Sequence, residues 1–383
     1  MKQKPLRFRP DGGLTIMQVS DPQDMHFVRH AMIQMLDAAY DLIRPDLVVF
    51  TGDNVLGNHL NDARFGNRRA VFDKEETFRR MRRALTYLLD PLDRRGIPFA
   101  FVYGNHDDMN EISKDRQATI YERYPGLRGL NRSDPRVDID TFNLPIYGSD
   151  GKKIVFNLWM LDSAGHDDDG ENAYTYVSEP TVNWYVETSE RLKRQNGGRP
   201  VPSLMFQHIP VPEIGGLLEE APASDPAAIP SRDGKFYRLN PELAQGTLGC
   251  DPRPHTENFG QFDAVVRQGD VLAIAAGHDH LNSFVGHLRG VDLIQTPCAS
   301  FRCFGNRLRG VRIFELDERQ PDRYRTYCLT YDELMGRGFR ARLRFFWDAD
   351  ETEKKKAAVL KAGAALLAAG AAAAAALLLR RKR

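Results

Sequence analysis

Cysteine is scarce in this sequence: four occur among 383 residues, and no two of them form a CxxC pair. A disulfide-rich miniprotein is therefore excluded, and we expect reduced, structural thiols. The N-terminus also lacks an apolar run, because MKQKPLRFRPDGG has charge but no hydrophobic segment of a secretory signal. We therefore expect the body of the chain to lie in the cytoplasm.

Acidic side chains are absent from residues 354–383, which contain eight Lys or Arg. The whole chain has 53 basic and 52 acidic residues, so residues 1–353 keep 45 basic residues against 52 acidic ones, a net charge of −7. Nucleic-acid binding depends on neutralising phosphates, and an acidic body does this poorly. No nucleic-acid partner is expected.

The order of apolar runs predicts an α/β fold. With 42% hydrophobic and 27% charged residues, the chain is neither disordered nor collagen-like. Short apolar runs alternate along the chain with segments whose apolar residues have helical spacing. This alternation of strand and helix is typical of sheets whose strands are connected by helices. We expect strands at 14–20, 46–51, 97–103, 154–161, 202–207 and 271–276, helices at 27–43, 73–95 and 180–195, and short antiparallel strands over 284–330. Residues 210–262 show little periodicity and are interpreted as a long insertion.

The C-terminal part has a different composition. Residues 331–356 read as a charged connector, and Ala362–Leu379 is a run of 18 apolar residues between basic flanks. Eighteen residues is about the minimum for a bilayer span. We predict a transmembrane anchor helix at 357–379 followed by a basic tail at 380–383, with membrane association as the consequence. The alternative is an Ala-rich soluble helix that binds a partner protein.

Five polar clusters share one placement, since each directly follows a predicted strand. They are Asp21-Pro22-Gln23, Gly52-Asp53-Asn54, Gly104-Asn105-His106-Asp107, Gln207-His208 and Gly277-His278-Asp279-His280. In open α/β sheets the loops beyond the carboxyl ends of strands converge on one crevice, so these side chains are expected to meet.

Carboxylate and amide oxygens together with imidazole nitrogens suit divalent metal ions such as Mn, Zn, Fe or Mg. One Asp can bridge two ions, and a pair of ions roughly 3.5 to 4 Å apart can clamp both the attacking and the leaving oxygen of a phosphoryl displacement. The clusters therefore predict two divalent metal ions and hydrolysis of a phosphate ester.

These clusters, in this order, resemble the calcineurin-like metallophosphoesterases, whose pattern runs D-x-H, G-D, G-N-H-D/E, a lone H and G-H-x-H. The resemblance covers roughly residues 14–317. Leu161-Asp162-Ser163, residues 258–262 (NFGQF) and residues 277–282 (GHDHLN) are most similar to the branch related to purple acid phosphatases. The resemblance implies a four-layer αββα sandwich of two mixed sheets, with residues 1–330 as the catalytic domain and a phosphomonoester or phosphodiester as substrate.

The resemblance also implies a role for each motif residue. Asp21 and His280 would hold the first metal ion, Asp53 would bridge both ions, and Asn105, His208 and His278 would hold the second. His106 matches the family's non-ligand histidine, which stabilises the phosphate or protonates the leaving oxygen, and Asp107 would orient its imidazole. A metal-bridging hydroxide would be the nucleophile.

Two positions depart from the family pattern. Gln23 stands where the first motif has His, so the first metal ion would gain only a neutral oxygen there, which weakens its binding or favours a harder ion. Leu56 stands where purple acid phosphatases have a Tyr, so a purple Fe(III) centre is not expected. We interpret Gln23 as a metal ligand. The alternative is a catalytically weak protein that binds metal or phosphate and is tethered to the membrane.

Overall fold

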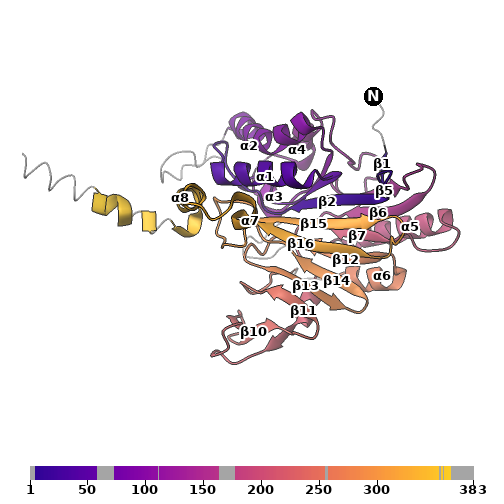
Figure 1. Cartoon of the computed structure of the whole chain (residues 1–383). Coiled ribbons are helices and arrows are strands. Elements are labelled where there is room, and N and C mark those ends of the chain that lie inside the picture. The colour runs from indigo at the N-terminus through magenta and orange to yellow at the C-terminus, as the bar shows by residue number, and fades with distance from the viewer. Residues whose placement is uncertain are drawn as a thin grey trace, which may run out of the picture.

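Two β-sheets pack face to face at the centre of the fold (Figure 1). The computed structural model describes residues 5–57, 73–110, 112–163, 177–254, 258–352, 355–356 and 358–363. Apolar side chains from both sheets fill the space between them. Phe206 of one sheet meets Phe314 of the other edge to face, with ring centroids 5.5 Å apart. Burial of this layer removes a large apolar area from water and holds the sheets together.

The first sheet has five strands of mixed direction. Strands β2, β3 and β4 run parallel to one another. Strand β15 pairs antiparallel with β2, and β16 pairs antiparallel with β15. The order is β16 (Tyr324–Thr330), β15 (Gly310–Asp317), β2 (Gly13–Val19), β3 (Leu47–Thr51) and β4 (Phe99–Val102). Every residue of β3 and β4 is buried, which agrees with their continuous apolar sequences.

The second sheet has eight strands and is also mixed. Strands β6, β7, β12 and β14 run parallel, and the outer strands β5, β13 and β11 are antiparallel to their neighbours toward the centre. The order is β1 (Leu6–Arg7), β5 (Phe142–Tyr147), β6 (Ile154–Met160), β7 (Ser203–Phe206), β12 (Val271–Ala276), β14 (Val291–Gln295), β13 (Ser283–Leu288) and β11 (Ala244–Thr247).

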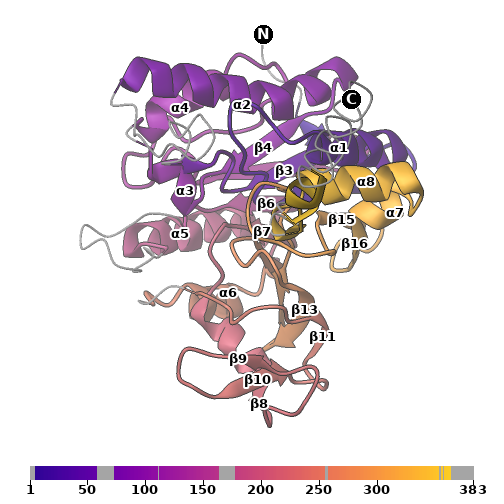
Figure 2. The ribbon, with the colours of Figure 1, turned by 90° about the vertical axis from the view of Figure 1, so that its left-hand side faces the viewer.

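Helices cover the outer face of each sheet (Figures 1 and 2). The five-stranded sheet is covered by α1 (His30–Ile43), α2 (Lys74–Arg95), α4 (Lys114–Tyr121), α7 (Tyr331–Met335) and α8 (Phe339–Asp348). The eight-stranded sheet is covered by α5 (Glu179–Gln195) and α6 (Gln261–Gln268). Helix α2 begins where the Asp73 carboxylate accepts a hydrogen bond from the Glu75 amide, and it ends at Gly96 in the left-handed conformation. The mixed α/β sheets agree with the layered architecture expected from the sequence.

The insertion at 210–262 contains more regular structure than its composition indicates. A short 3₁₀ helix (Pro212–Leu217) leads into a three-stranded sheet, and β11 then extends the eight-stranded sheet. The small sheet projects from the body (Figure 2) and has the order β8 (Leu218–Glu220), β10 (Phe236–Leu239), β9 (Ile229–Pro230). Strands of two to four residues are too short to show a periodic pattern, which is why the sequence did not reveal them.

Residues 331–356, which were predicted to form a charged connector, contain helices that the sequence pattern did not indicate. This stretch contains α7, α8 and a 3₁₀ turn (Asp350–Thr352), and Tyr331 and Phe345 are buried in the core beside Phe301. Because α8 contains three arginines, its composition did not indicate that one face of the helix packs on the core.

Among the helices of the described chain, none has an apolar stretch long enough to reach across a bilayer. Residues 364–383, which include most of the predicted anchor at 357–379 and the whole tail at 380–383, lie outside the described residues. The anchor therefore stays a prediction.

Candidate metal centre

The site residues follow the carboxyl ends of strands from both sheets. Asp21 follows β2, Asp53 follows β3, and the short helix α3 (Asn105–Asp108) follows β4. From the second sheet, His208 follows β7, and the His278–His280 turn follows β12. Because the strands within each set are parallel, their ends lie at one edge, and the two edges face each other across the sandwich.

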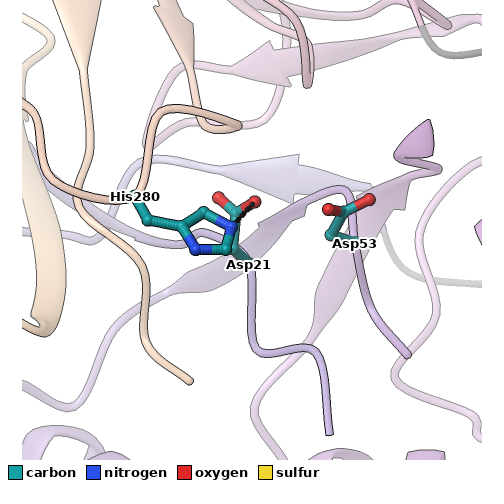
Figure 3. Close-up of side chains that lie close together, drawn as sticks. All are labelled: Asp21, Asp53 and His280. Carbon is teal, nitrogen blue, oxygen red and sulfur yellow. Dashed lines mark ion pairs between the residues drawn. The ribbon is translucent and has the colours of Figure 1, made fainter. Parts of the chain in front are cut away.

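Asp21, Asp53 and His280 form one group (Figure 3). Each offers one ligand atom, and these three atoms lie within 4.8 Å of one another. His280 Nε2 is 3.3 Å from Asp21 Oδ1, and all three side chains are buried. Two carboxylates and an imidazole at this spacing match the donor set of a divalent metal site.

A second group lies on the other side of Asp53. His208 Nε2 is 2.9 Å from Asn105 Oδ1 and 3.4 Å from Asp53 Oδ1. His278 Nδ1 is 3.3 Å from His208 Nε2. Asp53 therefore contacts residues of both groups, as a carboxylate shared by two ions would.

The tautomers of two histidines suit metal coordination. His208 Nδ1 lies 2.9 Å from the carbonyl oxygen of Thr51, and His280 Nδ1 lies 2.8 Å from that of Phe304. A carbonyl only accepts, so each Nδ1 carries the proton and each Nε2 turns its lone pair toward the oxygens of Asn105 or Asp21. Facing lone pairs repel unless a proton or a metal ion lies between them, so the residues present fit a metal site.

Gln23 also points into the first group. Its Nε2 atom is 3.2 Å from Asp53 Oδ2 and 3.2 Å from His280 Nε2. Its Oε1 atom is buried and has no hydrogen-bond partner among the residues that the structure describes. A carboxamide can rotate by 180° about its last bond, so the same position can offer Oε1 to an ion.

The loops that carry these ligands have unusual backbone conformations. Asp21, Asp53 and His278 have φ angles of 47°, 48° and 69°. Residues other than glycine adopt this region at a cost of about 1–3 kcal/mol each, and such strain clusters at functional sites. Close contact also explains Gly52 and Gly277, because a Cβ at these positions would lie 2.5 Å from the His208 ring and 2.0 Å from the Ser20 hydroxyl.

His106 lies beside Asp53 and is more exposed than that carboxylate. Its backbone amide donates a 2.8 Å hydrogen bond to Asp53 Oδ1, and its Nε2 atom is 4.0 Å from Asp53 Oδ2. The His106 side chain is 28% exposed, against 2% for Asp53. The imidazole can therefore meet a molecule that enters from solvent.

The Asp107 carboxylate binds backbone rather than solvent. It accepts hydrogen bonds from the amides of Gly104 at 2.8 Å, Asn54 at 3.0 Å and Val55 at 3.1 Å. It thus joins the loop that carries Asp53 to the helix that carries His106. Its predicted role in orienting the His106 imidazole stays a prediction.

Burial and neighbouring charges shift the pKa values of the candidate ligands. Burial and the nearby Asp21 charge raise the pKa of Asp53 well above its usual range. Burial opposes ionisation of Asp21 as well, but the neighbouring His280 outweighs it and lowers the pKa of Asp21. Burial, together with the adjacent His208, lowers the pKa of His278 and keeps its imidazole neutral, which is the form that binds metals.

Two further residues support the ligands: Phe304, which no sequence motif indicated, and Ser163, which belongs to the Leu161-Asp162-Ser163 stretch noted in the sequence. The Phe304 ring stacks on the His280 ring, with centroids 4.2 Å apart, and it stays 57% exposed. The Ser163 hydroxyl accepts hydrogen bonds of 3.0 Å from the amides of His208 and Ile209. Ser163 had a visible signal, because it follows β6 at a strand end like the ligands do, whereas Phe304 had none.

Comparison with known proteins gives the same family that the motifs resemble. The model of the calcineurin-like phosphoesterase family matches residues 14–282. Two Arabidopsis thaliana proteins named "Probable inactive purple acid phosphatase" 29 and 14 are 26% and 27% identical to this chain. The alignments cover 79% and 82% of this chain and 76% and 77% of the relatives. A solved dimetal phosphatase from Danio rerio aligns with 83% of this chain and 99% of its own, with 15% identity and a TM-score of 0.46. The chain belongs to the calcineurin-like phosphoesterase family.

Proposed function

We propose that this protein hydrolyses a phosphomonoester or phosphodiester with the help of two divalent metal ions. One observation carries the proposal: buried oxygen and nitrogen donors from five strand ends, in two sheets, converge around Asp53. Such a set is costly to bury without a cation, and two cations beside each other are suited to phosphoryl transfer.

The residues divide into two ligand sets in this proposal. Asp21, Gln23 and His280 would hold one ion, Asn105, His208 and His278 would hold the other, and Asp53 would be shared between them. Bound divalent ions lower the pKa of water and neutralise charge on a phosphate, which is the chemistry that hydrolysis needs. The metals considered from the donor types are Mn, Fe, Zn and Mg.

His106 acts on the substrate side of the site in this proposal. Its partly exposed imidazole lies 4.0 Å from Asp53 and can approach the ester, so it stabilises the phosphate or protonates the leaving oxygen. Asp107 is a positioning residue, since its backbone hydrogen bonds hold the Asp53 loop against α3.

Activity of designed variants tests the function. Protein loaded with Mn should cleave p-nitrophenyl phosphate or its bis-ester, and Asp53→Asn or His106→Ala should remove most of the rate. His287→Ala is the matched control, because His287 lies on β13 and is 64% exposed, with Asp292 as its partner. Equal turnover in all four proteins would refute the assignment.

The second candidate function is a catalytically weak protein that binds metal or phosphate. Two observations favour it: Gln23 replaces the His of the family pattern, and the two Arabidopsis relatives carry the word "inactive" in their names. Elemental analysis separates the two candidates. Two ions per chain with turnover support the enzyme, and one ion or none without turnover supports the binding protein.

We also propose that the catalytic domain lies in the cytoplasm and that residues 357–379 tether it to a membrane. The 18 apolar residues of Ala362–Leu379 and their basic flanks support this proposal. The full chain should require detergent, and a chain that ends at residue 356 should not. Equal solubility of both would argue for a partner-binding helix instead.

A further inference from the structure

Helix α8 carries an apolar stripe that faces solvent. Phe339, Leu343 and Trp347 are 79%, 43% and 39% exposed. They are spaced four residues apart, so they lie on one face of the helix. Large apolar side chains gathered on an exposed face mark an interaction surface, whereas single ones do not.

Arginines border this stripe on both sides. At 100° per residue, Arg340 and Arg344 lie along one side of the stripe and Arg342 lies along the other. All three are exposed, and within the described part of the chain Arg340 and Arg342 form no ion pair. Arg344 Nη1 is 3.9 Å from Asp348 Oδ1.

The opposite face of α8 fixes this orientation. Phe345 packs between the rings of Phe301 and Tyr331, with both centroid distances at 5.4 Å. Asp348, the one acidic residue of α8, is buried and accepts a 2.7 Å hydrogen bond from the Ala31 amide at the start of α1. The helix therefore cannot turn its apolar stripe inward without breaking these contacts. Its one acidic residue, Asp348, lies near Arg344 and leaves Arg340 and Arg342 without an acidic partner on α8.

We propose that α8 is an interfacial helix that lies on the surface of a bilayer containing anionic phospholipids. An apolar stripe with basic borders is the pattern of helices that lie in the headgroup region, where the apolar side chains enter the acyl boundary and the arginines pair with lipid phosphates. Anionic lipid complements the positive borders. The apolar run Ala362–Leu379 begins fourteen residues after α8 and agrees with a nearby bilayer.

Helix α8 lies at the same edge of the molecule as the loops of the metal centre. Asp348 caps the start of α1, and α1 follows the end of β2 that carries Asp21. The loop between β14 and β15 also links them, because Phe301 packs on α8 while Phe304 stacks on His280. Docking through α8 brings this edge close to the lipid surface.

Tryptophan fluorescence tests the proposal directly in the full chain. The sequence has three tryptophans, and Trp159 and Trp184 are buried, so Trp347 alone among them is exposed. Phosphatidylcholine vesicles with 30% phosphatidylserine and brominated acyl chains should quench part of the emission. Trp347→Phe should abolish that quenching, because the remaining tryptophans do not reach lipid.

Charge reversal separates α8 from the apolar tail. Arg340→Glu with Arg342→Glu should weaken binding to these vesicles at least about 30-fold, since each basic residue contributes about 1 kcal/mol at an anionic surface. The matched control is Lys152→Glu with Lys153→Glu on the exposed β5–β6 turn, at the opposite end of the sheet from the site. This control should bind like the wild type.

Three outcomes would overturn the proposal. Equal binding of all variants to anionic and neutral vesicles would assign binding to the tail alone. Trp347 shielded from acrylamide in the lipid-free chain would mean that a protein segment covers the stripe, either residues 364–383 or a second copy. Binding without any quenching of Trp347 would show that α8 stays away from the lipid.

Discussion

Asn105 Oδ1 lies 2.9 Å from His208 Nε2, although Asn105 follows a strand of the five-stranded sheet and His208 follows a strand of the eight-stranded sheet. The contact joins residues 103 positions apart in the chain. The candidate metal centre is therefore assembled across the interface between the sheets, and its geometry depends on how they pack.

Replacing either residue of this pair should remove one metal ion. Asn105→Ala and His208→Ala each delete a donor of the proposed second ion, so elemental analysis should find about one ion per chain instead of two. Turnover of bis-p-nitrophenyl phosphate should fall by roughly 100-fold or more, since even outer partners of metal ligands contribute 10–100-fold. Two ions retained in both variants would show that these residues are not ligands.

Gln23→His should strengthen binding of zinc at the proposed first ion. The imidazole replaces a neutral amide oxygen by a nitrogen donor that zinc prefers, in a position 3.2 Å from His280 and Asp53. Competition with a chelator should show higher zinc affinity for Gln23→His than for the wild type, and lower affinity for Gln23→Ala. If all three proteins have the same affinity, Gln23 does not take part in the site.

Gly52→Ala should disrupt the site by steric contact with His208. Gly52 has a φ angle of 81°, and an added Cβ would lie 2.5 Å from His208 Nδ1. Gly198 provides a matched control, because its φ angle is 84° and nothing lies within 4 Å of an added Cβ. We expect a loss in the free energy of unfolding of about 1 kcal/mol for Gly198→Ala and about 3 kcal/mol for Gly52→Ala, with activity lost only in the latter. Urea denaturation of both variants measures the difference, and equal losses would contradict it.

The buried carboxyl group of Asp270 should make stability depend on pH. Burial raises the pKa of Asp270 to about 6, although the Ser189 hydroxyl donates a 3.0 Å hydrogen bond to it. The folded state then binds a proton between pH 4 and 6 that the unfolded state releases, so the stabilisation is complete below about pH 4 and is lost as the pH rises through 6.

Asp270→Asn removes this titration. Between pH 4 and pH 7 the wild type should lose about 3 kcal/mol of its free energy of unfolding through this group, and the variant should not. The shift is about two pKa units, and each pKa unit corresponds to about 1.4 kcal/mol. Urea denaturation at the two pH values measures this change. A constant difference between variant and wild type would mean that the pKa of Asp270 is not raised.

Long periodic elements could be predicted from the sequence almost to the residue. Helix α2 was expected at 73–95 and is found at Lys74–Arg95, and the strand expected at 271–276 is found at Val271–Ala276. Short strands such as Ile229–Pro230 could not be predicted, because two residues hold no period. Helix α8 was missed because its sequence alternates arginine with apolar residues, and only the contact of Phe345 with the core shows which face is buried.

The order of the candidate ligands and their chemical types could be predicted from the sequence alone. An apolar run followed by a polar residue such as Asp53 or His208 is a local pattern that the sequence shows directly. Two features were decided only by the tertiary structure: the contact of Asn105 with His208, and the stacking of Phe304 on His280. Strand and helix formation depend on neighbours within a few residues, whereas these contacts depend on strand order and on the packing of two sheets, which bring together residues far apart in the chain.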